Sequence, residues 1–438
     1  MRRVELTIEK LIYGGDGLAR LRSNGEARAK TVFVPYVLPG EKVEAEITEE
    51  RPGFARAELT KVLQPSPKRT AAPCPYFGEC GGCHYQHISY EEQLRLKTDI
   101  LRETLRRTGK LDLELEIQTH ASPAFAYRNR TRFHLQTNLD FAIGYFKHGS
   151  HELLPVRECP ISSRLINRAL AQIWKLEELA HVPEQIGEVE MFADAGDERI
   201  MAELYLRPGR VNNDELSKFA SALAAAVPEM HGAASFPHVG SRSRSSEPVN
   251  PLQLHGAASM SYEAAGETYR VSAGTFFQTN RFLIPSMIEL AVRECRGSLA
   301  LDLYSGVGLF AVPLARRFER VIAVESSPVS VADLSANVPE NVKVSSQTVE
   351  TYLNSVPAAL KPDLIVVDPP RAGLGENVSA QIARLAKSEI VYISCDPATL
   401  ARDLRELASC GWKIAEMHLI DLFPQTFHIE TCTVLRRG

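Results

Sequence analysis

Apolar and polar residues alternate along the first 63 residues of the chain. The alternation runs through RRVELTIEKL, KTVFVPYVL, KVEAEITEE and ARAELTKVL, which are separated by the turn-forming sequences GGDG, SNGE and LPGE. A period of two residues predicts strands with one buried face. Short strands joined by close turns are typical of a small barrel of the oligonucleotide-binding kind, although a generic small β domain fits the same pattern.

Helical periodicity enters after a Pro-rich, basic linker at residues 63–73. The stretch SYEEQLRLKTDILRETLRRTG at 89–109 predicts an amphipathic helix. Residues 120–270 mix strand-like and helix-like segments, and the Ser/Arg-rich GSRSRSSEPVNP at 240–251 is typical of a flexible loop. From about residue 285 helices and strands alternate, as they do in βαβ units.

These changes of pattern, in a chain of 438 residues, predict three domains, at 1–63, 74–270 and 271–438. A composition of 44% hydrophobic and 24% charged residues is that of a soluble globular protein. No apolar run is long enough to cross a membrane, and the first residues lack the apolar core of a signal peptide, so we expect a cytoplasmic protein. The net charge of −4 argues against an extensive basic surface but permits a local basic groove.

The stretch SLALDLYSGVGLFAVPLARRFERVIAVESSPVSV, residues 298–331, predicts a strand, a glycine turn, a helix and a second strand. Gly306 and Gly308 would let a ligand approach the backbone at a helix N-terminus, and Glu325 ends the second strand, where it could bind ribose hydroxyls. Together with Ala311 the glycines satisfy the loose dinucleotide pattern. Nicotinamide and S-adenosylmethionine cofactors both fit this unit, and a tight turn without a ligand fits it too.

Asp368 opens the sequence DPP at the predicted end of the next strand, facing the same crevice. Its prolines stiffen the turn and leave carbonyl groups free of ladder bonds, so that polar groups can point at a planar base. Variants of this motif recur in methyltransferases that act on nucleic-acid bases, whereas a dehydrogenase gives no reason for it. The motif therefore favours S-adenosylmethionine over a nicotinamide.

Cys395 lies in VYISCDPATL, where a strand ends and a helix begins. A buried, inert thiol is the plain reading. The alternative is a nucleophile, because addition of a thiolate to C6 of a pyrimidine makes C5 able to accept a methyl group. A helix N-terminus would favour the anionic thiol. The C5 proton must then be removed by a base, and Glu430 in FPQTFHIE is the candidate, although alone it would usually be a solvated carboxylate.

Four motifs together resemble the RNA uracil-C5 methyltransferases, specifically the branch that modifies 23S ribosomal RNA. They are GTFFQTN, DPPRAGL, SCDPATLARDL and FPQTFHIE, and the resemblance covers nearly the whole chain. It implies that Cys395 is the nucleophile and Glu430 the base. It also places Gln278, Tyr304, Glu325 and Asp368 at S-adenosylmethionine, with Gly306 and Gly308 in the cofactor loop. SSQTVE at 345–350 departs from the family pattern, and no site is assigned there.

The resemblance also implies a fold of the α/β plus β class. Its parts are an N-terminal TRAM barrel, a central α+β domain with an iron–sulfur cluster, and a C-terminal Rossmann-like methyltransferase domain. The TRAM barrel would hold RNA while the target uridine is flipped into the crevice. RNA is thus the expected partner, with neither a membrane nor a protein partner implied.

Three cysteines cluster at Cys74, Cys80 and Cys83. In a reducing compartment such a cluster indicates metal binding or catalysis rather than a disulfide. The fourth ligand could be His84, His87 or the distant Cys159, so spacing alone leaves zinc and iron–sulfur open. The family resemblance implies a [4Fe–4S] cluster on Cys74, Cys80, Cys83 and Cys159, with a structural role or one in RNA folding.

Arg128, Arg130 and Arg132 alternate in YRNRTRFH with aromatic residues on the other face, which predicts contacts to unpaired RNA. A solvated basic strand face is the alternative. Three rival functions remain at this point. They are the same chemistry on tRNA, a non-catalytic RNA-binding protein on a methyltransferase fold, and a nicotinamide oxidoreductase that passes electrons to the cluster.

Overall fold

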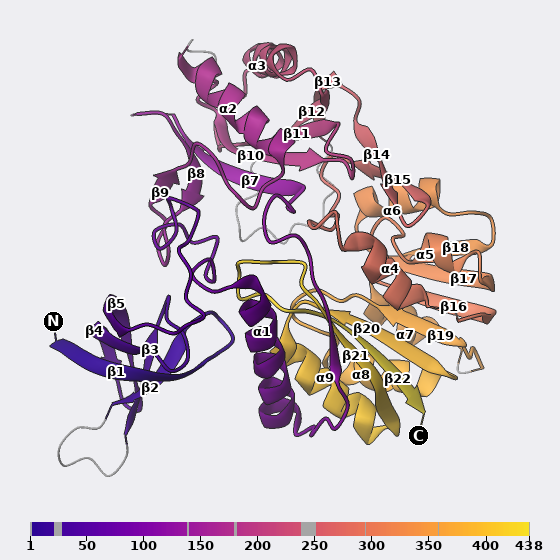
Figure 1. Cartoon of the computed structure of the whole chain (residues 1–438). Coiled ribbons are helices and arrows are strands. Elements are labelled where there is room, and N and C mark those ends of the chain that lie inside the picture. Colours follow the sequence, from indigo (N-terminus) through magenta and orange to yellow (C-terminus); the bar gives the residue numbers. More distant parts are fainter. Residues whose placement is uncertain are drawn as a thin grey trace.

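The computed structural model describes residues 2–21, 29–137, 140–178, 182–237, 251–293, 295–357 and 359–437. The predicted turn at 23–26 and all of the predicted loop at 240–251 except Pro251 lie outside the described residues. Figure 1 shows a small barrel, a central domain and a larger C-terminal domain, with helix α1 (Tyr90–Thr104) beside the C-terminal sheet. Among the residues described, no helix is long and apolar enough to cross a membrane.

The N-terminal strands close into a five-stranded barrel in the order β1-β2-β3-β5-β4. Its strands are β1 (Arg2–Leu11), β2 (Gly17–Leu21), β3 (Lys30–Val34), β4 (Lys42–Arg51) and β5 (Phe54–Gln64). Alternate residues point inward, and Leu6, Val32 and Val43 belong to its core. A Cβ at Gly17 would lie 2.3 Å from Val37 Cγ2, so the barrel wall requires glycine there. The predicted barrel is confirmed.

The central domain is a seven-stranded sheet in the order β13-β12-β11-β10-β7-β8-β9. Helices α2 (Arg164–Glu178) and α3 (Asn213–Ala226) pack on it and share one apolar core with it. The strands are β7 (Arg130–Gln136), β8 (Ala142–Phe146), β9 (Leu153–Pro155), β10 (Ile186–Ala193), β11 (Ile200–Leu206), β12 (Met230–Phe236) and β13 (Leu252–Gly256).

The C-terminal domain is built on an eight-stranded sheet in the order β18-β17-β16-β19-β20-β22-β21-β6. Its strands are β16 (Gly297–Leu303), β17 (Phe318–Glu325), β18 (Val342–Ser346), β19 (Leu364–Val367), β20 (Glu389–Ser394), β21 (Trp412–Ile420), β22 (Glu430–Arg437) and β6 (Ile117–His120). The helices are α4 (Ile284–Val292), α5 (Ala311–Leu314), α6 (Pro328–Asn337), α7 (Val349–Ser355), α8 (Gly375–Leu385) and α9 (Pro397–Ser409). Two apolar cores include residues of the sheet, and all four residues of β19 are buried, as in parallel sheets covered on both faces. The predicted Rossmann-like domain is confirmed.

The predicted boundaries of the central and C-terminal domains need correction. Helix α1 packs its apolar side into the core of the C-terminal domain, and β6 pairs with β21 of that sheet. The hairpin of β14 (Ser259–Ala264) and β15 (Glu267–Ser272) packs in a core that residues of the C-terminal domain share with residues of the central sheet, such as Phe192 and Met201. Periodicity predicts that a helix or strand has an apolar face, but it does not say which neighbour covers that face. This is why these segments were assigned to the wrong domain.

Candidate active site

One cavity of about 590 Å³ opens at the carboxyl ends of β16, β17, β19 and β20. Ligands bind at this edge of open α/β sheets. The sequence-predicted residues that line it are Gln278, Tyr304, Gly306, Glu325, Asp368, Cys395 and Glu430. The tertiary structure thus brings together seven of the eight residues that the sequence assigned to catalysis and to the cofactor.

Gly308, the eighth of these residues, does not line the cavity but belongs to the same glycine loop and packs against Leu334. Its φ is +93°, and a Cβ there would lie 2.8 Å from Leu334 Cδ1. Gly306 has a φ of +55°, and no atom lies within 4 Å of the position that a Cβ would take there, so a side chain would project into open space. Open space over Gly306 fits a ligand that approaches the backbone closely.

Glu325 closes the far side of this loop. Its carboxylate accepts hydrogen bonds from the backbone N–H of Gly306 at 2.9 Å and from those of Ser326 and Ser327, each at 2.7 Å. These bonds tie the glycine turn after β16 to the end of β17. They fix the carboxylate at the edge of the cavity, where a ribose would be held.

Two acids lie at this edge of the sheet: Asp368, which lines the cavity and is partly buried, and Asp302, which is fully buried. Burial raises the pKa of Asp368 to about 7, and Gln278 Nε2 donates a hydrogen bond to its Oδ2 at 3.5 Å. Asp302 on β16 was not found by the sequence analysis, although an acid within the apolar strand LALDL is a usable signal. Burial, followed by the Asp368 charge, raises the pKa of Asp302 to about 8, and among the residues that the structure describes neither of its carboxylate oxygens has a hydrogen-bond partner.

Cys395 follows β20 directly and is half-buried. Asp396 caps α9, and its carboxylate accepts from the N–H groups of Ala398 at 3.0 Å and Thr399 at 2.9 Å. Burial, then the charges of Glu430 and Asp368, raise the pKa of Cys395 to about 12. Burial therefore outweighs the expected effect of the helix N-terminus on the pKa of this thiol, and the first donors of α9 are already bound by Asp396.

Glu430 begins β22, which runs antiparallel to β20. The last pair in their register is Ser394 with Thr431, so Cys395 and Glu430 occupy the next positions on the two strands. The Glu430 side chain is buried. Burial, followed by the charge of Asp368, raises the pKa of Glu430 well above its usual range. The thiol and the carboxyl group therefore face one cavity, and burial raises the pKa of both groups.

Arg371 and His428 also line this cavity, and the sequence analysis gave neither of them a role. Arg371 Nη2 lies 3.4 Å from His428 Nδ1. Among the described residues Arg371 forms no ion pair, which leaves its charge available to the cavity. Burial, followed by Arg371, lowers the pKa of His428 to about 3, so this imidazole is neutral. The sequence signal that could have identified Arg371 is its place in the motif DPPRAGL.

The four predicted cluster cysteines meet in a second cavity of about 180 Å³, although Cys159 lies 76 positions after Cys83. All eight cysteines are free thiols. His84 and His87 do not line this cavity: the His84 ring packs on Phe427 at 4.6 Å, and His87 Nε2 lies 3.4 Å from the carbonyl oxygen of Val37. Within the described part of the chain, no three His, Cys, Asp or Glu side chains are grouped as ligands of a metal ion.

The structure places the three predicted RNA-contacting arginines in different surroundings, and it contradicts the prediction for Arg130, which is buried. Arg130 is 9% exposed; it pairs with Glu190 and, at 3.1 Å, with Glu203. Arg132 also pairs with Glu190, at 2.6 Å, and its guanidinium lies 3.9 Å from the ring centroid of Tyr205. Arg128 lines the cysteine cavity. Arg130 and Arg132 connect β7 to carboxylates on β10 and β11, and the sequence near these arginines does not reveal those partners.

Comparisons with known proteins agree with this geometry. The model of the tRNA (uracil-5-)-methyltransferase family matches residues 89–352 and 357–438, and that of the TRAM domain matches residues 2–60. An uncharacterized RNA methyltransferase of Aquifex aeolicus is 34% identical over 99% of this chain and 98% of its own length. The 23S rRNA (uracil(1939)-C(5))-methyltransferase RlmD of Vibrio parahaemolyticus is 30% identical over 100% of this chain and 97% of its own.

A solved structure supports the fold over the full length. The tRNA (uracil-54, C5)-methyltransferase of Pyrococcus abyssi, in complex with S-adenosyl-L-homocysteine, superposes with a TM-score of 0.75 at 23% identity. The match covers 99% of this chain and 100% of that one. With the family model matching most of the sequence, the chain belongs to the tRNA (uracil-5-)-methyltransferase family and is an S-adenosylmethionine-dependent RNA uracil-C5 methyltransferase with an N-terminal TRAM domain.

Proposed function

We propose that this enzyme methylates C5 of a uridine in 23S rRNA, with Cys395 as the nucleophile and Glu430 as the base. The observation that carries the proposal is the placement of these two side chains at neighbouring strand ends over one cavity. Gly306 and Glu325 line the other side of the same cavity and would hold the methyl donor. A thiol, a carboxyl group and a donor site on one sheet edge are what C5 methylation requires.

The reaction begins with addition of the Cys395 thiolate to C6 of the uracil. This forms the C6–S bond and makes C5 nucleophilic. S-adenosylmethionine supplies the electrophilic methyl group. Once C5 carries this methyl group, Glu430 accepts the C5 proton, and the electrons of that C–H bond form the C5–C6 double bond as the C6–S bond breaks. Cys395 is then free again as a thiolate.

The resting protonation states define what must change before the reaction starts. The Cys395 thiol is neutral at rest, so it must lose its proton, and Arg371 is the neighbouring group whose charge lowers its pKa. Burial raises the pKa of Glu430 as well, and this carboxyl group must be ionised to accept the C5 proton. Arg371 therefore serves both steps, because a cation stabilises the thiolate and the carboxylate alike.

We further propose that Cys74, Cys80, Cys83 and Cys159 hold a [4Fe–4S] cluster. In support, four thiols line one cavity and the two candidate histidines lie outside it. Clusters of this type are held by four cysteine thiolates, which these four residues would supply. Anaerobically purified protein should contain iron and acid-labile sulfide in equal amounts, and Cys83→Ser should lose both. Zinc without sulfide would contradict the cluster.

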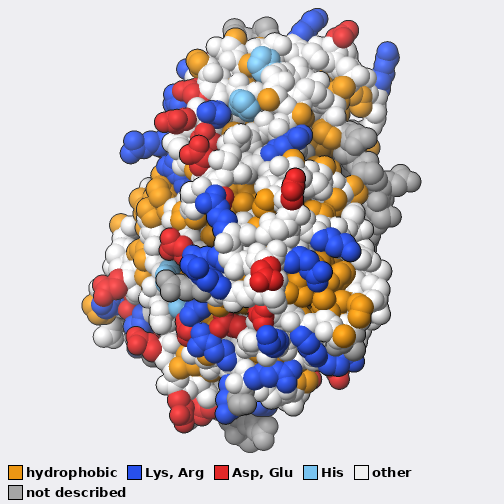
Figure 2. Space-filling model, turned by 90° about the vertical axis from the view of Figure 1, so that its right-hand side faces the viewer, with side chains coloured by type: hydrophobic (Ala, Val, Ile, Leu, Met, Phe, Trp, Pro, Cys, Tyr) orange, Lys and Arg blue, Asp and Glu red, His pale blue; other side chains and the backbone are white. Residues whose placement is uncertain are grey.

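The rRNA substrate is supported by the 30% identity to an rRNA-modifying relative over the full chain. The fold neighbour named as a tRNA enzyme makes tRNA the second candidate. On the face of the molecule that Figure 2 draws, basic, acidic and apolar side chains are interspersed, in keeping with the net charge of −4. We therefore infer that RNA is bound through shape and stacking more than through a broad basic surface.

The deciding experiment supplies methyl-labelled S-adenosylmethionine with unmodified 23S rRNA or unmodified tRNA. Label in 5-methyluridine of rRNA, absent with Cys395→Ala, is the expected result. Label in tRNA alone would keep the chemistry and replace the substrate. If neither RNA is labelled by folded protein that binds S-adenosylhomocysteine, the protein would instead be a non-catalytic RNA-binding protein.

A further inference from the structure

The loop between β21 and β22, residues 421–429, forms one wall of the active site; we call it the base loop. Its members Phe423 and His428 line the catalytic cavity, and the loop leads directly into Glu430. Gln425 in its middle is 3% exposed and has a φ of +68°. A non-glycine residue with this backbone conformation is held there by its surroundings.

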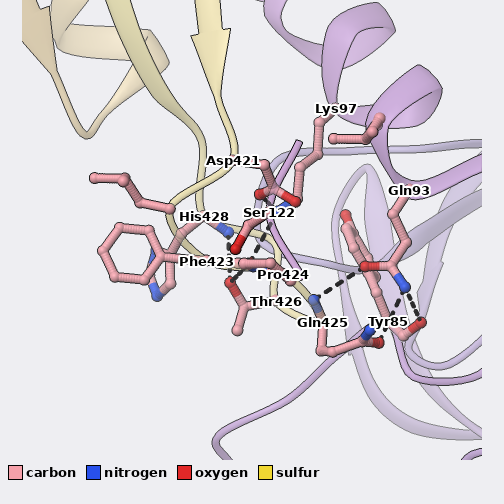
Figure 3. A network of polar contacts seen from close by, with 12 residues as sticks. Tyr85, Gln93, Lys97, Ser122, Asp421, Phe423, Pro424, Gln425, Thr426 and His428 are labelled. Carbon is pink, nitrogen blue, oxygen red and sulfur yellow. Dashed lines mark hydrogen bonds and ion pairs between the residues drawn. The ribbon is translucent and has the colours of Figure 1, made fainter. Parts of the chain in front are cut away.

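Gln93 on α1 forms two hydrogen bonds that fix the conformation of Gln425 (Figure 3). Its side chain is fully buried. Gln93 Oε1 accepts the backbone N–H of Gln425 at 3.0 Å, and Gln93 Nε2 donates to Gln425 Oε1, also at 3.0 Å. The same Nε2 donates to the carbonyl oxygens of Tyr85 at 3.1 Å and Ile88 at 2.9 Å. One side chain therefore ties the base loop to the segment that follows the cysteine cluster.

That segment also contacts the loop directly. The backbone N–H groups of His84 and Tyr85 donate to the carbonyl oxygen of Gln425 at 2.8 and 2.9 Å. The His84 ring packs on Phe427 at 4.6 Å, and Phe427 packs on His428 at 4.4 Å. His84 is the neighbour of Cys83 in the chain. Residues 84–88, which follow the cysteine cluster and which we call the cysteine segment, thus pack directly against the base loop.

Two further side chains anchor the loop at other points. Lys97, one turn after Gln93 on α1, donates to Asp421 Oδ1 at 2.6 Å and to the carbonyl oxygen of Phe423 at 3.0 Å (Figure 3). The hydroxyl group of Tyr127 donates to the carbonyl oxygen of Pro424 at 3.0 Å. The carbonyl groups of three consecutive loop residues, 423 to 425, therefore find partners outside the loop. These partners add to the hydrogen bonds within the loop, in which the N–H and hydroxyl groups of Thr426 donate to the carbonyl oxygen of Phe423 at 3.3 and 2.9 Å.

We propose that Gln93 is a positioning residue. It acts through Gln425 to hold the base loop, and with it Glu430, in a fixed position against the cysteine segment. On the cofactor side, Gly306 and Glu325 are held by each other, and none of the hydrogen bonds of Gln93 reaches them. Loss of the Gln93 amide should therefore slow the step that uses Glu430 and leave cofactor affinity unchanged. This inference rests on the proposed role of Glu430 as the base.

The step that Glu430 performs has a distinctive readout. Until the C5 proton is removed, the C6–S bond cannot break, so a poorly placed base leaves enzyme covalently attached to methylated RNA. Such an adduct survives denaturation and is seen as a shifted band in a denaturing gel. A variant with a generally weakened fold would lose adduct and product together.

The experiment compares Gln93→Met with Gln381→Met under single-turnover conditions. Gln381, on α8, bonds to Asn354 and Asn377 and does not line the catalytic cavity, so it is the matched control. For Gln93→Met we expect release of methylated RNA to slow by about 10- to 100-fold, the loss typical of a small misplacement of a catalytic group. The adduct fraction should rise, and the dissociation constant of S-adenosylhomocysteine should stay within about twofold.

Tyr127→Phe is the second variant, because removal of one hydroxyl group is compatible with folding even where Gln93→Met is not. This variant should also raise the adduct fraction, but by less than Gln93→Met does. Normal adduct levels in the folded variants, or an equal rise in Gln381→Met, would overturn the inference. A Glu430→Gln enzyme that forms no adduct while the wild type methylates RNA would overturn the role of Glu430 and, with it, the inference.

Discussion

The Cys395 thiol is predicted to be unreactive in the free enzyme, although it is the proposed nucleophile. Burial, followed by the charges of Glu430 and Asp368, raises its pKa to about 12 from an ordinary value of 9.0. At pH 8 the thiolate fraction is then about a thousandfold smaller than that of an ordinary thiol, since each pH unit is a factor of ten. The enzyme would thereby protect its nucleophile from oxidation and alkylation until substrates bind.

The assay is alkylation by iodoacetamide between pH 7 and pH 10, with peptide mass spectrometry to separate the sites. Cys410 is exposed and serves as the reference thiol within the same sample. The Cys395 rate should rise about tenfold per pH unit across the whole range, because the thiol titrates above it. This slope separates a raised pKa from poor access, which lowers the rate equally at every pH.

Two variants test the cause. Glu430→Gln should raise the alkylation rate of Cys395 at pH 10, because it removes the charge that most opposes ionisation. Arg371→Met should lower it, because Arg371 is the charge that favours the thiolate. A Cys395 rate that levels off near pH 9, or variants that change it in the same direction, would refute the electrostatic reasoning.

Three further predictions concern other parts of the molecule. Gly306→Ala should weaken S-adenosylhomocysteine binding at least about tenfold in calorimetry, because a Cβ there occupies the ligand's approach, and should cost about 1–2 kcal/mol of stability, because alanine is strained at a φ of +55°; unchanged affinity would contradict this. Arg130→Met should cost about 3–5 kcal/mol of unfolding free energy in urea, because it leaves the buried carboxylate of Glu203 without its cation and that of Glu190 with Arg132 alone, while RNA affinity of the folded variant stays unchanged. Asp302 has a folded-state pKa of about 8, raised above its ordinary 3.8, so its stabilising contribution is present at low pH and is lost as pH rises. Stability should fall by up to about 4 kcal/mol between pH 5 and pH 8, and Asp302→Asn should flatten this slope.

The sequence was informative wherever the physics is local. Alternation along residues 1–63 predicted the strands of the barrel, because a strand with one buried face imprints a period of two. The glycine turn at Gly306 was readable because few residues adopt its backbone conformation. Short motifs around Cys395 and Glu430 were sufficient to indicate both the chemistry and the family. Each of these features depends on a few consecutive residues.

Features that depend on distant partners were decided by the tertiary structure. Nothing near Arg130 indicates that Glu190 and Glu203 neutralise it, and nothing near Gln93 indicates a bond to Gln425, 332 positions away. Helix α1 was predicted as a helix but placed in the wrong domain, because its apolar face does not specify the surface that covers it. The pKa of Cys395 depended on burial and on charges from other strands, which outweigh the local helix N-terminus. The sequence by itself thus determined which groups are present and which local conformations hold them, whereas the packing of distant segments determined which groups meet and in what ionisation state.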